Sequence, residues 1–313
     1  MSIFKVNDLK KYYQTQSPFQ EKKIIKALNG VSFSLEYKKT LGLVGESGCG
    51  KSTLAKTLLQ LEDTTSGNIS FEDKNINDIN SKYYRSSVQM IFQDPYNSLN
   101  PRKQAWELIS APLLINTKLS KQERFDMATQ MMEQVGLRKN LAHRYPHMFS
   151  GGQRQRLGIA RALILKPKII ICDEPVSALD VSIQAQVLNL MIELQNKMNL
   201  TYLFISHDLS VVKHISDFIM VMYLGKIVEY GASDQVFNNP KHPYTKALLS
   251  SAPTTKQNAQ EKIQLKGEIP SPLSPPKGCS FHTRCPIATE ECKQVDPTLK
   301  LINEVKVACH KVE

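Results

Sequence analysis

Apolar and polar residues follow each other in patterns that predict strands separated by helices. Residues 31–35 (VSFSL) alternate with a period of two, which indicates a half-buried antiparallel strand, and residues 68–73 (NISFED) have the same pattern. Continuous apolar runs, which are typical of strands buried in a parallel sheet, occupy residues 40–44, 88–92, 168–172 and 201–205. The chain therefore shows the strand types of an α/β fold.

Two segments between these runs have the periodicity of amphipathic helices. One extends from about Lys121 to Val135 and is followed by Gly136 as a stop signal. Its apolar face consists of Phe125, Ala128, Met132 and Val135. The other begins with Ser182 as its N-cap and has an apolar stripe of Ile183, Val187, Leu190 and Leu194. The single tryptophan, Trp106, is either a core residue or the anchor of an interface.

The composition changes after Phe237. Prolines punctuate residues 240–276, and such a segment holds neither long helices nor a central strand. We therefore place a domain boundary near Asn238, with one domain over residues 1–238 and a smaller one over residues 239–313.

Charge and hydropathy narrow the function classes. The 313 residues carry a formal net charge of +11, which suits nucleic acid, an anionic membrane face or a polyanionic cofactor. No segment approaches 18 consecutive apolar residues, and the start MSIFKVNDLKKYY lacks the apolar core of a signal peptide. We therefore expect a soluble, cytosolic chain whose membrane role, if it has one, depends on partners.

A glycine-rich turn follows the apolar run at residues 40–44. Residues 45–53 read GESGCGKST, which fits G-x-x-x-x-G-K-[ST], and the helix-like TLAKTLLQL begins at its last residue. In such a loop backbone N–H groups converge on phosphate oxygens, the lysine reaches the β and γ phosphates, and the serine hydroxyl binds Mg²⁺. The turn predicts a nucleotide site formed by Gly45, Ser47, Gly48, Cys49, Gly50, Lys51, Ser52 and Thr53.

Polar residues follow three of the other predicted strands at their carboxyl ends, where open α/β sheets bind ligands. Asp173 is expected to hold the Mg²⁺ shell, and Glu174 to accept a proton from the attacking water. Gln93 is predicted to contact Mg²⁺ or that water, and His207 to hydrogen-bond the γ-phosphate. Taken alone, Gln93 or His207 would be an ordinary surface residue.

With these motifs in order, the chain resembles the ATPase subunits of ABC transporters. The P-loop, Gln93, FSGGQ at residues 149–153, CDEP, SALD and SHD follow each other as in that family, with Phe149 where leucine is commoner. The resemblance implies an ABC-type P-loop NTPase fold: a RecA-like core, an antiparallel β subdomain and a helical signature subdomain at about 95–165. It also implies that Tyr12 stacks on adenine, with the adjacent Tyr13 as the alternative.

The same resemblance implies that two ATPase domains pair head to tail and hold each ATP between them. The γ-phosphate on one P-loop would then meet the partner's signature residues Ser150, Gly151, Gly152 and Gln153, with Asp180 across the same interface. The implied partners are a second ABC ATPase subunit, expected to form a heterodimer, two transmembrane permease subunits and a periplasmic or extracellular peptide-binding protein. The chain would lie peripherally on the cytoplasmic face of the inner membrane.

The tail resembles the C-terminal extension of peptide-importer ATPases. HPY at residues 242–244 and PSPLSPP at residues 270–276 carry this likeness, and the chain reads most like the F subunit of dipeptide importers. The oligopeptide, nickel and glutathione branches are similar, so another small solute stays an alternative. A nucleic-acid ATPase is the distant alternative, because its relatives carry a coiled coil or zinc module after the P-loop, or two ATPase domains, and this sequence has neither.

The six cysteines divide unevenly. Cys49 and Cys172 lie in predicted motifs and are most simply packed residues, whereas Cys279, Cys285, Cys292 and Cys309 crowd the last 35 residues. Cytosolic disulfides are rare, so the clustering favours a metal site, although no C-x₂-C pair typical of zinc ribbons is present. Resembling importers hold a [4Fe–4S] cluster at this extension. We expect a cluster on these four thiols, with zinc and free thiols as alternatives, besides ATP and Mg²⁺ at the P-loop.

Overall fold

The computed structural model describes residues 1–15, 23–94, 98–251 and 263–312. Its contacts form two compact units. We call the unit of Met1–Glu36, Thr40–Asn75 and Ser206–Glu313 the P-loop unit, and the unit of Tyr37–Lys39 and Ile76–Ile205 the signature unit. The division into domains at residue 238 stays a prediction. The start of the predicted helical subdomain, at residues 95–97, lies outside the described residues.

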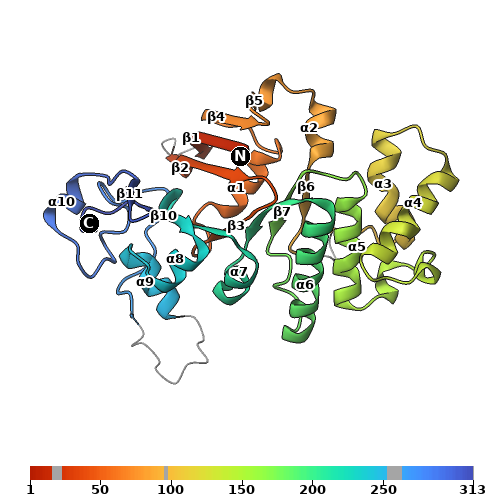
Figure 1. The fold of residues 1–313 in the computed structure, drawn as a ribbon. Helices are drawn as coiled ribbons and strands as arrows, with labels where there is room; N and C mark the ends of the chain where they lie inside the picture. The colour runs from red at the N-terminus through yellow and green to blue at the C-terminus, as the bar shows by residue number, and fades with distance from the viewer. Residues whose placement is uncertain (16–22, 95–97, 252–262, 313) are drawn as a thin grey trace. The chain divides into compact units, whose positions relative to one another are not determined.

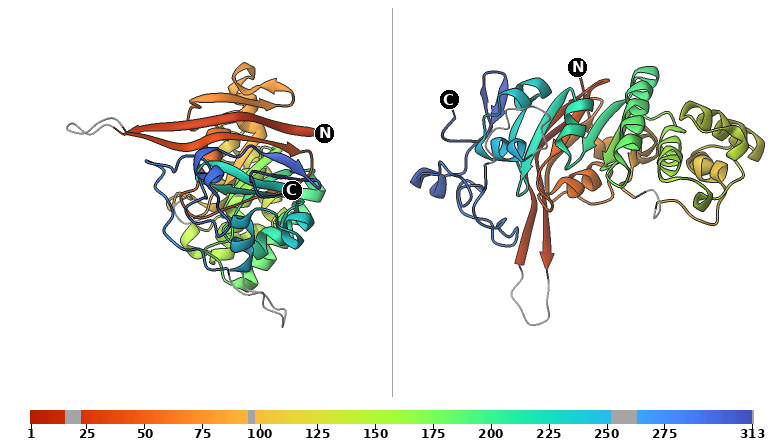
Figure 2. Two further views of the ribbon diagram at one scale, coloured as in Figure 1. Left: turned by 90° about the vertical axis from the view of Figure 1, so that its left-hand side faces the viewer. Right: turned by 90° about the horizontal axis from the view of Figure 1, so that it is seen from below.

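An antiparallel sheet of order β2-β1-β4-β5 belongs to the P-loop unit (Figures 1 and 2). Strand β1 (Ser2–Thr15) pairs with both β2 (Lys23–Glu36) and β4 (Ser66–Phe71), so that Val6 faces Phe33 on one side and Ile69 on the other. Strand β5 (Lys74–Asn75) closes the edge. The alternating segments are confirmed as strand over residues 31–35, where Val31, Phe33 and Leu35 are buried, and over residues 68–71. Glu72 and Asp73, which the pattern included, form the turn after β4.

The second group of strands in the P-loop unit has the order β11-β12-β10-β9-β3. Strand β3 (Thr40–Val44) is fully buried and parallel to β9 (Phe218–Tyr223), and β10 (Lys226–Ala232) runs antiparallel to β9. From the C-terminal extension, β12 (Val305–Val307) pairs with β10 and with β11 (Lys300–Ile302). The extension therefore continues the sheet that begins at the P-loop strand.

The helices of the P-loop unit are short. They are α1 (Lys51–Leu58), α7 (Leu209–Ile215), α8 (Ser233–Asn238), α9 (Pro243–Ser250) and α10 (Glu290–Gln294). The last two belong to the proline-punctuated tail, whose short elements agree with the prediction from its composition.

Three parallel strands in the order β8-β7-β6 belong to the signature unit. Strand β7 (Ile169–Asp173) lies between β6 (Val88–Ile91) and β8 (Thr201–Ile205), with Ile171 opposite Met90 and Leu203. The runs at residues 168–172 and 201–205 are thus confirmed as buried parallel strands. The run at residues 88–92 is a parallel strand that is buried only in part, and Phe92 lies outside it and is exposed. A 3₁₀ turn (Ile76–Asp78) and helix α2 (Ser81–Ser87) precede β6.

Helices make up most of the remaining signature unit. They are α3 (Ala105–Asn116), α4 (Lys121–Gln134), α5 (Gly151–Leu163) and α6 (Val181–Met198), with 3₁₀ turns at Lys139–Leu141 and Pro146–Met148. Figure 1 draws α3, α4 and α5 as one yellow-to-green group. Helix α4 begins and ends within one residue of its predicted bounds. Ser182 is not the N-cap of α6, because Asp180 has the extended backbone of a cap and Ser182 already lies in the helix.

Trp106 is a core residue of the signature unit. Its side chain is buried, its ring meets Phe125 edge-on at 5.5 Å, and its Nε1 donates to Gln104. Within the described ranges, no helix is long and apolar enough to cross a membrane.

Candidate active site

The P-loop has the geometry of an anion site. It connects β3 to α1, and Gly50 stands at the N-cap of α1 with a left-handed φ of 110°. A Cβ on Gly50 would lie 2.4 Å from the Ala27 carbonyl oxygen, so only glycine fits there. Since Gly50 has no side chain with which to cap the helix, the first-turn N–H groups of α1 stay available to a ligand.

Lys51 lies folded back over this loop. Its Nζ donates to the carbonyl oxygens of Gly45 at 2.7 Å and of Glu46 at 3.0 Å, and the residue is buried. These carbonyls supply the partial negative charge that a phosphate supplies in a loaded P-loop. The ammonium can therefore exchange its carbonyl partners for phosphate oxygens without leaving the loop.

Tyr12 and Tyr13, which both lie in β1, have different surroundings. The Tyr12 hydroxyl donates to Asn29 at 2.7 Å. The Tyr13 hydroxyl bonds to Glu62, and its pKa is raised by burial and by Glu62 and lowered by the hydroxyl of Thr53 in α1. Tyr13 is thus the tyrosine that lies beside the P-loop helix.

His207 belongs to the P-loop unit and is exposed directly after the buried Ser206. The next residue, Asp208, caps α7 by accepting from the N–H groups of Ser210 and Val211. Burial raises the pKa of Asp208, but the hydrogen bond from the Ser210 hydroxyl and those from the two N–H groups outweigh it and lower the pKa overall. The motif SHD thus contains one structural cap and one exposed imidazole.

The signature unit brings Gln93 and Glu174 together. Gln93 Nε2 donates to Glu174 Oε2 at 2.9 Å. Glu174 has a left-handed backbone with a φ of 46°, which is uncommon for a residue other than glycine and is typical of functional sites. Its N–H donates to the Ile205 carbonyl at 2.9 Å, and its own carbonyl accepts from the Ser177 hydroxyl at 3.0 Å. Asp173, the last residue of β7, precedes it directly.

The signature loop is held by a reciprocal cap. Ser150 Oγ accepts from the Gln153 N–H at 3.3 Å, and Gln153 Oε1 accepts from the Ser150 N–H at 3.1 Å. Gly152 packs against α6, because a Cβ there would lie 2.5 Å from Ile183. Asp180, at the N-cap of α6, is exposed. The predicted signature residues thus lie on two adjoining helix N-termini of the same unit.

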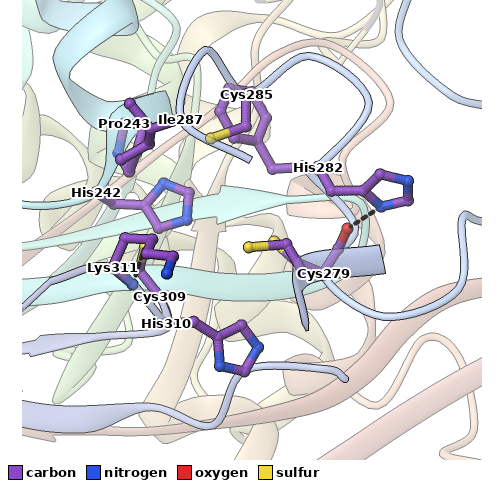
Figure 3. Close-up of a pocket in the computed structure, with 11 residues that line it drawn as sticks. His242, Pro243, Cys279, His282, Cys285, Ile287, Cys309, His310 and Lys311 are labelled. Atoms are coloured by element: carbon purple, nitrogen blue, oxygen red, sulfur yellow. Dashed lines mark hydrogen bonds between the residues drawn. The ribbon is translucent and has the colours of Figure 1, made fainter. Parts of the chain in front are cut away.

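The four tail cysteines line one pocket, together with His242, Phe281, His282 and His310. Figure 3 shows Cys279, Cys285 and Cys309 entering it from separate segments. Burial, together with the neighbouring thiols of Cys292, Cys309 and Cys285, raises the pKa of Cys279 to about 11. Across the described ranges, no group of three or more histidine, cysteine or acidic side chains is arranged to hold a metal ion. Cys49 and Cys172 are buried, as packed residues should be.

Comparison with known proteins decides the family. Residues 28–177 match the model described as ABC transporter, and residues 228–292 the one described as oligopeptide/dipeptide transporter, C-terminal region. The dipeptide transport ATP-binding protein DppF of Haemophilus influenzae is 53% identical over 97% of this chain and 95% of its own. The chain belongs to the ABC transporter family. The oligopeptide transport ATP-binding protein AppF of Bacillus subtilis is also 53% identical, over 99% of this chain and 97% of its own.

Solved structures agree with the assigned fold. A dimeric ATP-binding cassette, MJ0796, bound to ADP and phosphate, is similar with a TM-score of 0.65 and 27% identity. The similarity covers 74% of this chain and 98% of that one. The CbiO1 protein of Clostridium perfringens, part of the ABC transporter complex CbiONQ, gives the same TM-score. The chain is therefore an ABC ATPase, and the predicted fold class is confirmed.

Three residues at the P-loop were missed from the sequence. Glu46 lies inside the motif at a position that the pattern leaves open, while Tyr244 and Arg284 come from the extension and bond to it. The sequence held two signals: Tyr244 is part of HPY, and Arg284 directly precedes Cys285. Neither position has a spacing that points to the P-loop.

Proposed function

We propose that this chain is the ATP-hydrolysing subunit of an importer that takes up dipeptides or short peptides. The observation that carries the proposal is the match of residues 228–292 to the peptide-transporter C-terminal region. The similarity to the ATP-binding cassette MJ0796 covers 74% of the chain, so the match to the C-terminal region adds a part that the ATPase cassette does not explain. The relatives named for dipeptide and oligopeptide transport support it over nearly the whole chain.

Uptake by the assembled transporter tests this proposal. The chain would be coexpressed with its permease and binding-protein partners, reconstituted in vesicles and supplied with a labelled dipeptide, nickel or glutathione. ATP-dependent accumulation of the dipeptide, lost in the Lys51→Ala variant, is the expected result. Accumulation of nickel or glutathione alone would move the chain to another branch, and salt-sensitive binding of DNA or RNA without uptake would favour a nucleic-acid ATPase.

The proposed assembly has a second ATPase subunit, two transmembrane permeases and a substrate-binding protein, with this chain on the cytoplasmic face of the membrane. Its ATP would be held between two ATPase domains, the P-loop of one facing Ser150 to Gln153 of the other. The N-terminus of α5 supports this role, because its cap is made within the loop and Ser150 is exposed. The dimeric state of MJ0796 bound to ADP and phosphate supports the pairing.

In the proposed chemistry, the P-loop and Lys51 bind the phosphates, and Ser52, Gln93 and Asp173 serve Mg²⁺. Glu174 orients the attacking water and takes its proton, and the hydrogen bond from Gln93 supports this role by fixing the direction of the carboxylate. His207 would contact the γ-phosphate. For adenine stacking, the place of Tyr13 beside Thr53 supports Tyr13, and the role of Tyr12 stays a prediction.

We also propose that Cys279, Cys285, Cys292 and Cys309 bind a [4Fe–4S] cluster. The four thiols line one pocket from separate positions of the extension, which supports the proposal because cluster thiolates come from such separated loops. In this structure they are not arranged to hold a metal ion, so binding the cluster would draw them closer together. When bound, the cluster would hold these loops together and supply a one-electron redox centre. Protein purified anaerobically should be brown, with about four irons per chain, and Cys285→Ser should lose the colour. Zinc in place of iron, or neither metal, would contradict the proposal.

A further inference from the structure

Glu46 is held from several sides in the P-loop. Its backbone N–H donates to the Tyr244 hydroxyl at 2.9 Å, and its carbonyl oxygen accepts from Lys51 Nζ at 3.0 Å. Its carboxylate accepts two bonds from the Arg284 guanidinium, at 2.7 and 3.1 Å. Backbone and side chain of this one residue are therefore both fixed.

The Arg284 contact differs from the others because it joins two opposite charges by two hydrogen bonds. The pair is bidentate and charge-assisted, and the Arg284 side chain is only 8% exposed while that of Glu46 is 24% exposed. Removing one partner would leave the other charge partly buried without its counter-ion, which costs more than removing both.

Packing ties these contacts to the cysteine pocket. The Tyr244 ring is fully buried and lies 4.8 Å from the Tyr223 ring and 5.4 Å from the Phe281 ring, between centroids. Phe281 and His242 line the cysteine pocket. His242 accepts from the Tyr244 N–H, and burial lowers its pKa to about 3, so it stays neutral and keeps that acceptor.

The HPY segment is itself anchored to the sheet. The carboxylate of Glu229, a fully buried residue of β10, accepts from the N–H groups of Lys241 at 2.7 Å and His242 at 2.9 Å. The Tyr244 hydroxyl therefore reaches Glu46 from a fixed base, and a rigid donor–acceptor pair of this kind limits the shapes that the loop can adopt.

Charge gives Arg284 a second effect on the loop. Glu46 places a negative charge in a site that receives a polyphosphate, and an unpaired carboxylate there would repel it. The Arg284 guanidinium neutralises that charge. Both the shape and the electrostatic potential of the P-loop thus depend on a residue adjacent to Cys285.

We propose that the C-terminal extension pre-organises the P-loop for nucleotide, with Arg284 and Tyr244 as positioning residues that act through Glu46. Nucleotide binding and the order of the cysteine pocket are then thermodynamically linked, each favouring the other. This inference rests on the proposed role of the P-loop as the nucleotide site. It assigns to the extension a regulatory function on the nucleotide site of the ATPase.

The first test is a double-mutant cycle on nucleotide affinity. The Kd for MgATP of the full-length, anaerobically purified chain would be measured by calorimetry for Arg284→Gln, Glu46→Gln and the double variant. Arg284→Gln should weaken MgATP binding about tenfold, because it removes the two hydrogen bonds to the Glu46 carboxylate and leaves that charge unpaired. The double variant should bind better than Arg284→Gln alone, which a merely structural arginine would not produce.

Two further variants keep the test informative if Arg284→Gln does not fold. Tyr244→Phe keeps the buried ring and removes the hydroxyl, and should weaken MgATP binding about threefold. Arg284→Lys keeps the charge without the bidentate contact and should restore part of the affinity. Arg102→Gln, an exposed arginine of the signature unit, is the matched control and should bind like the wild type.

The second readout is hydrogen exchange in residues 278–285. Saturating MgATP should slow exchange there in the wild-type chain and not in Arg284→Gln. If Lys51→Ala binds MgATP as tightly as the wild type, the P-loop assignment fails. The other contradicting result is that Lys51→Ala weakens MgATP binding, whereas Arg284→Gln and Tyr244→Phe do not, and that MgATP leaves exchange in residues 278–285 unchanged. The P-loop assignment would then stand, and the proposal that the extension pre-organises the P-loop would be overturned.

Discussion

The P-loop and the signature loop are both glycine-containing turns that open a helix, yet the chain holds them by different means. Bonds to Glu46 in the P-loop come from Tyr244 and Arg284, which are 198 and 238 positions away in the sequence. The signature loop is held by Ser150 and Gln153, which are 3 positions apart. One loop therefore depends on tertiary structure, and the other largely on its own sequence.

This difference suits the two proposed roles. In its proposed role the P-loop binds the nucleotide of its own chain, so contacts from a separate module can tune its affinity. In its proposed role the signature loop would meet the nucleotide of a partner and would need an accessible helix N-terminus, which a local cap leaves uncovered. A change at the P-loop should thus be felt at distant residues, whereas one at the signature loop should stay local.

The largest effect is expected at Glu174, whose proposed role is in ATP hydrolysis and not in nucleotide binding. Glu174→Gln should reduce ATP turnover by about 10² to 10⁴, because it removes a general base while leaving the P-loop intact. Turnover would be measured in the assembled complex, and the Kd for MgATP in the same sample. Near-normal turnover would exclude the role of Glu174, and a weakened Kd would show that the two units do not divide binding from chemistry.

Ser150→Arg tests whether the signature loop acts on a partner. A bulky cation at this helix N-terminus should leave ATP binding by the isolated chain unchanged and lower turnover at the partner's P-loop by about 10². Lys51→Ala should instead weaken binding in its own chain. The two variants would be compared in a heterodimer with one tagged site, and damage to the same P-loop by both would contradict head-to-tail pairing.

The tyrosines of β1 give a smaller effect. Loss of a base-stacking ring costs about 1–3 kcal/mol, so Tyr13→Ala should weaken MgATP binding by about tenfold. Tyr12→Ala should change it less, since its hydroxyl is held by Asn29, and it serves as the matched control. The opposite order of Kd values would return the stacking role to Tyr12.

The smallest effect is expected at Gln153. Removing its side chain from the reciprocal cap should lower the free energy of unfolding by about 1 kcal/mol, read from the midpoint of chemical denaturation. Gln130→Ala, an exposed glutamine within α4, should leave the midpoint almost unchanged. An unchanged midpoint in Gln153→Ala would show that this cap does not hold the signature loop.

Most of the fold and the motif residues could be read from the sequence because their signals are local. Parallel strands such as β7 appear as apolar runs, and the pairing of Gln93 with Glu174 follows from their places after neighbouring strands. The bonds of Glu46 to Tyr244 and Arg284 could not be read, because no periodicity links residues so far apart. The N-cap of α6 was misplaced because Ser182 and Asp180 are both good caps, and only the backbone decides between them.

Hydrogen exchange of Arg284→Gln against the wild type tests the central contrast most directly. In the full-length chain without nucleotide, the account predicts faster exchange in the P-loop and α1, residues 45–58, and unchanged exchange in the signature loop and α5, residues 150–163. Unchanged exchange at residues 45–58 in a folded Arg284→Gln variant would contradict it, as would an equal increase in both segments.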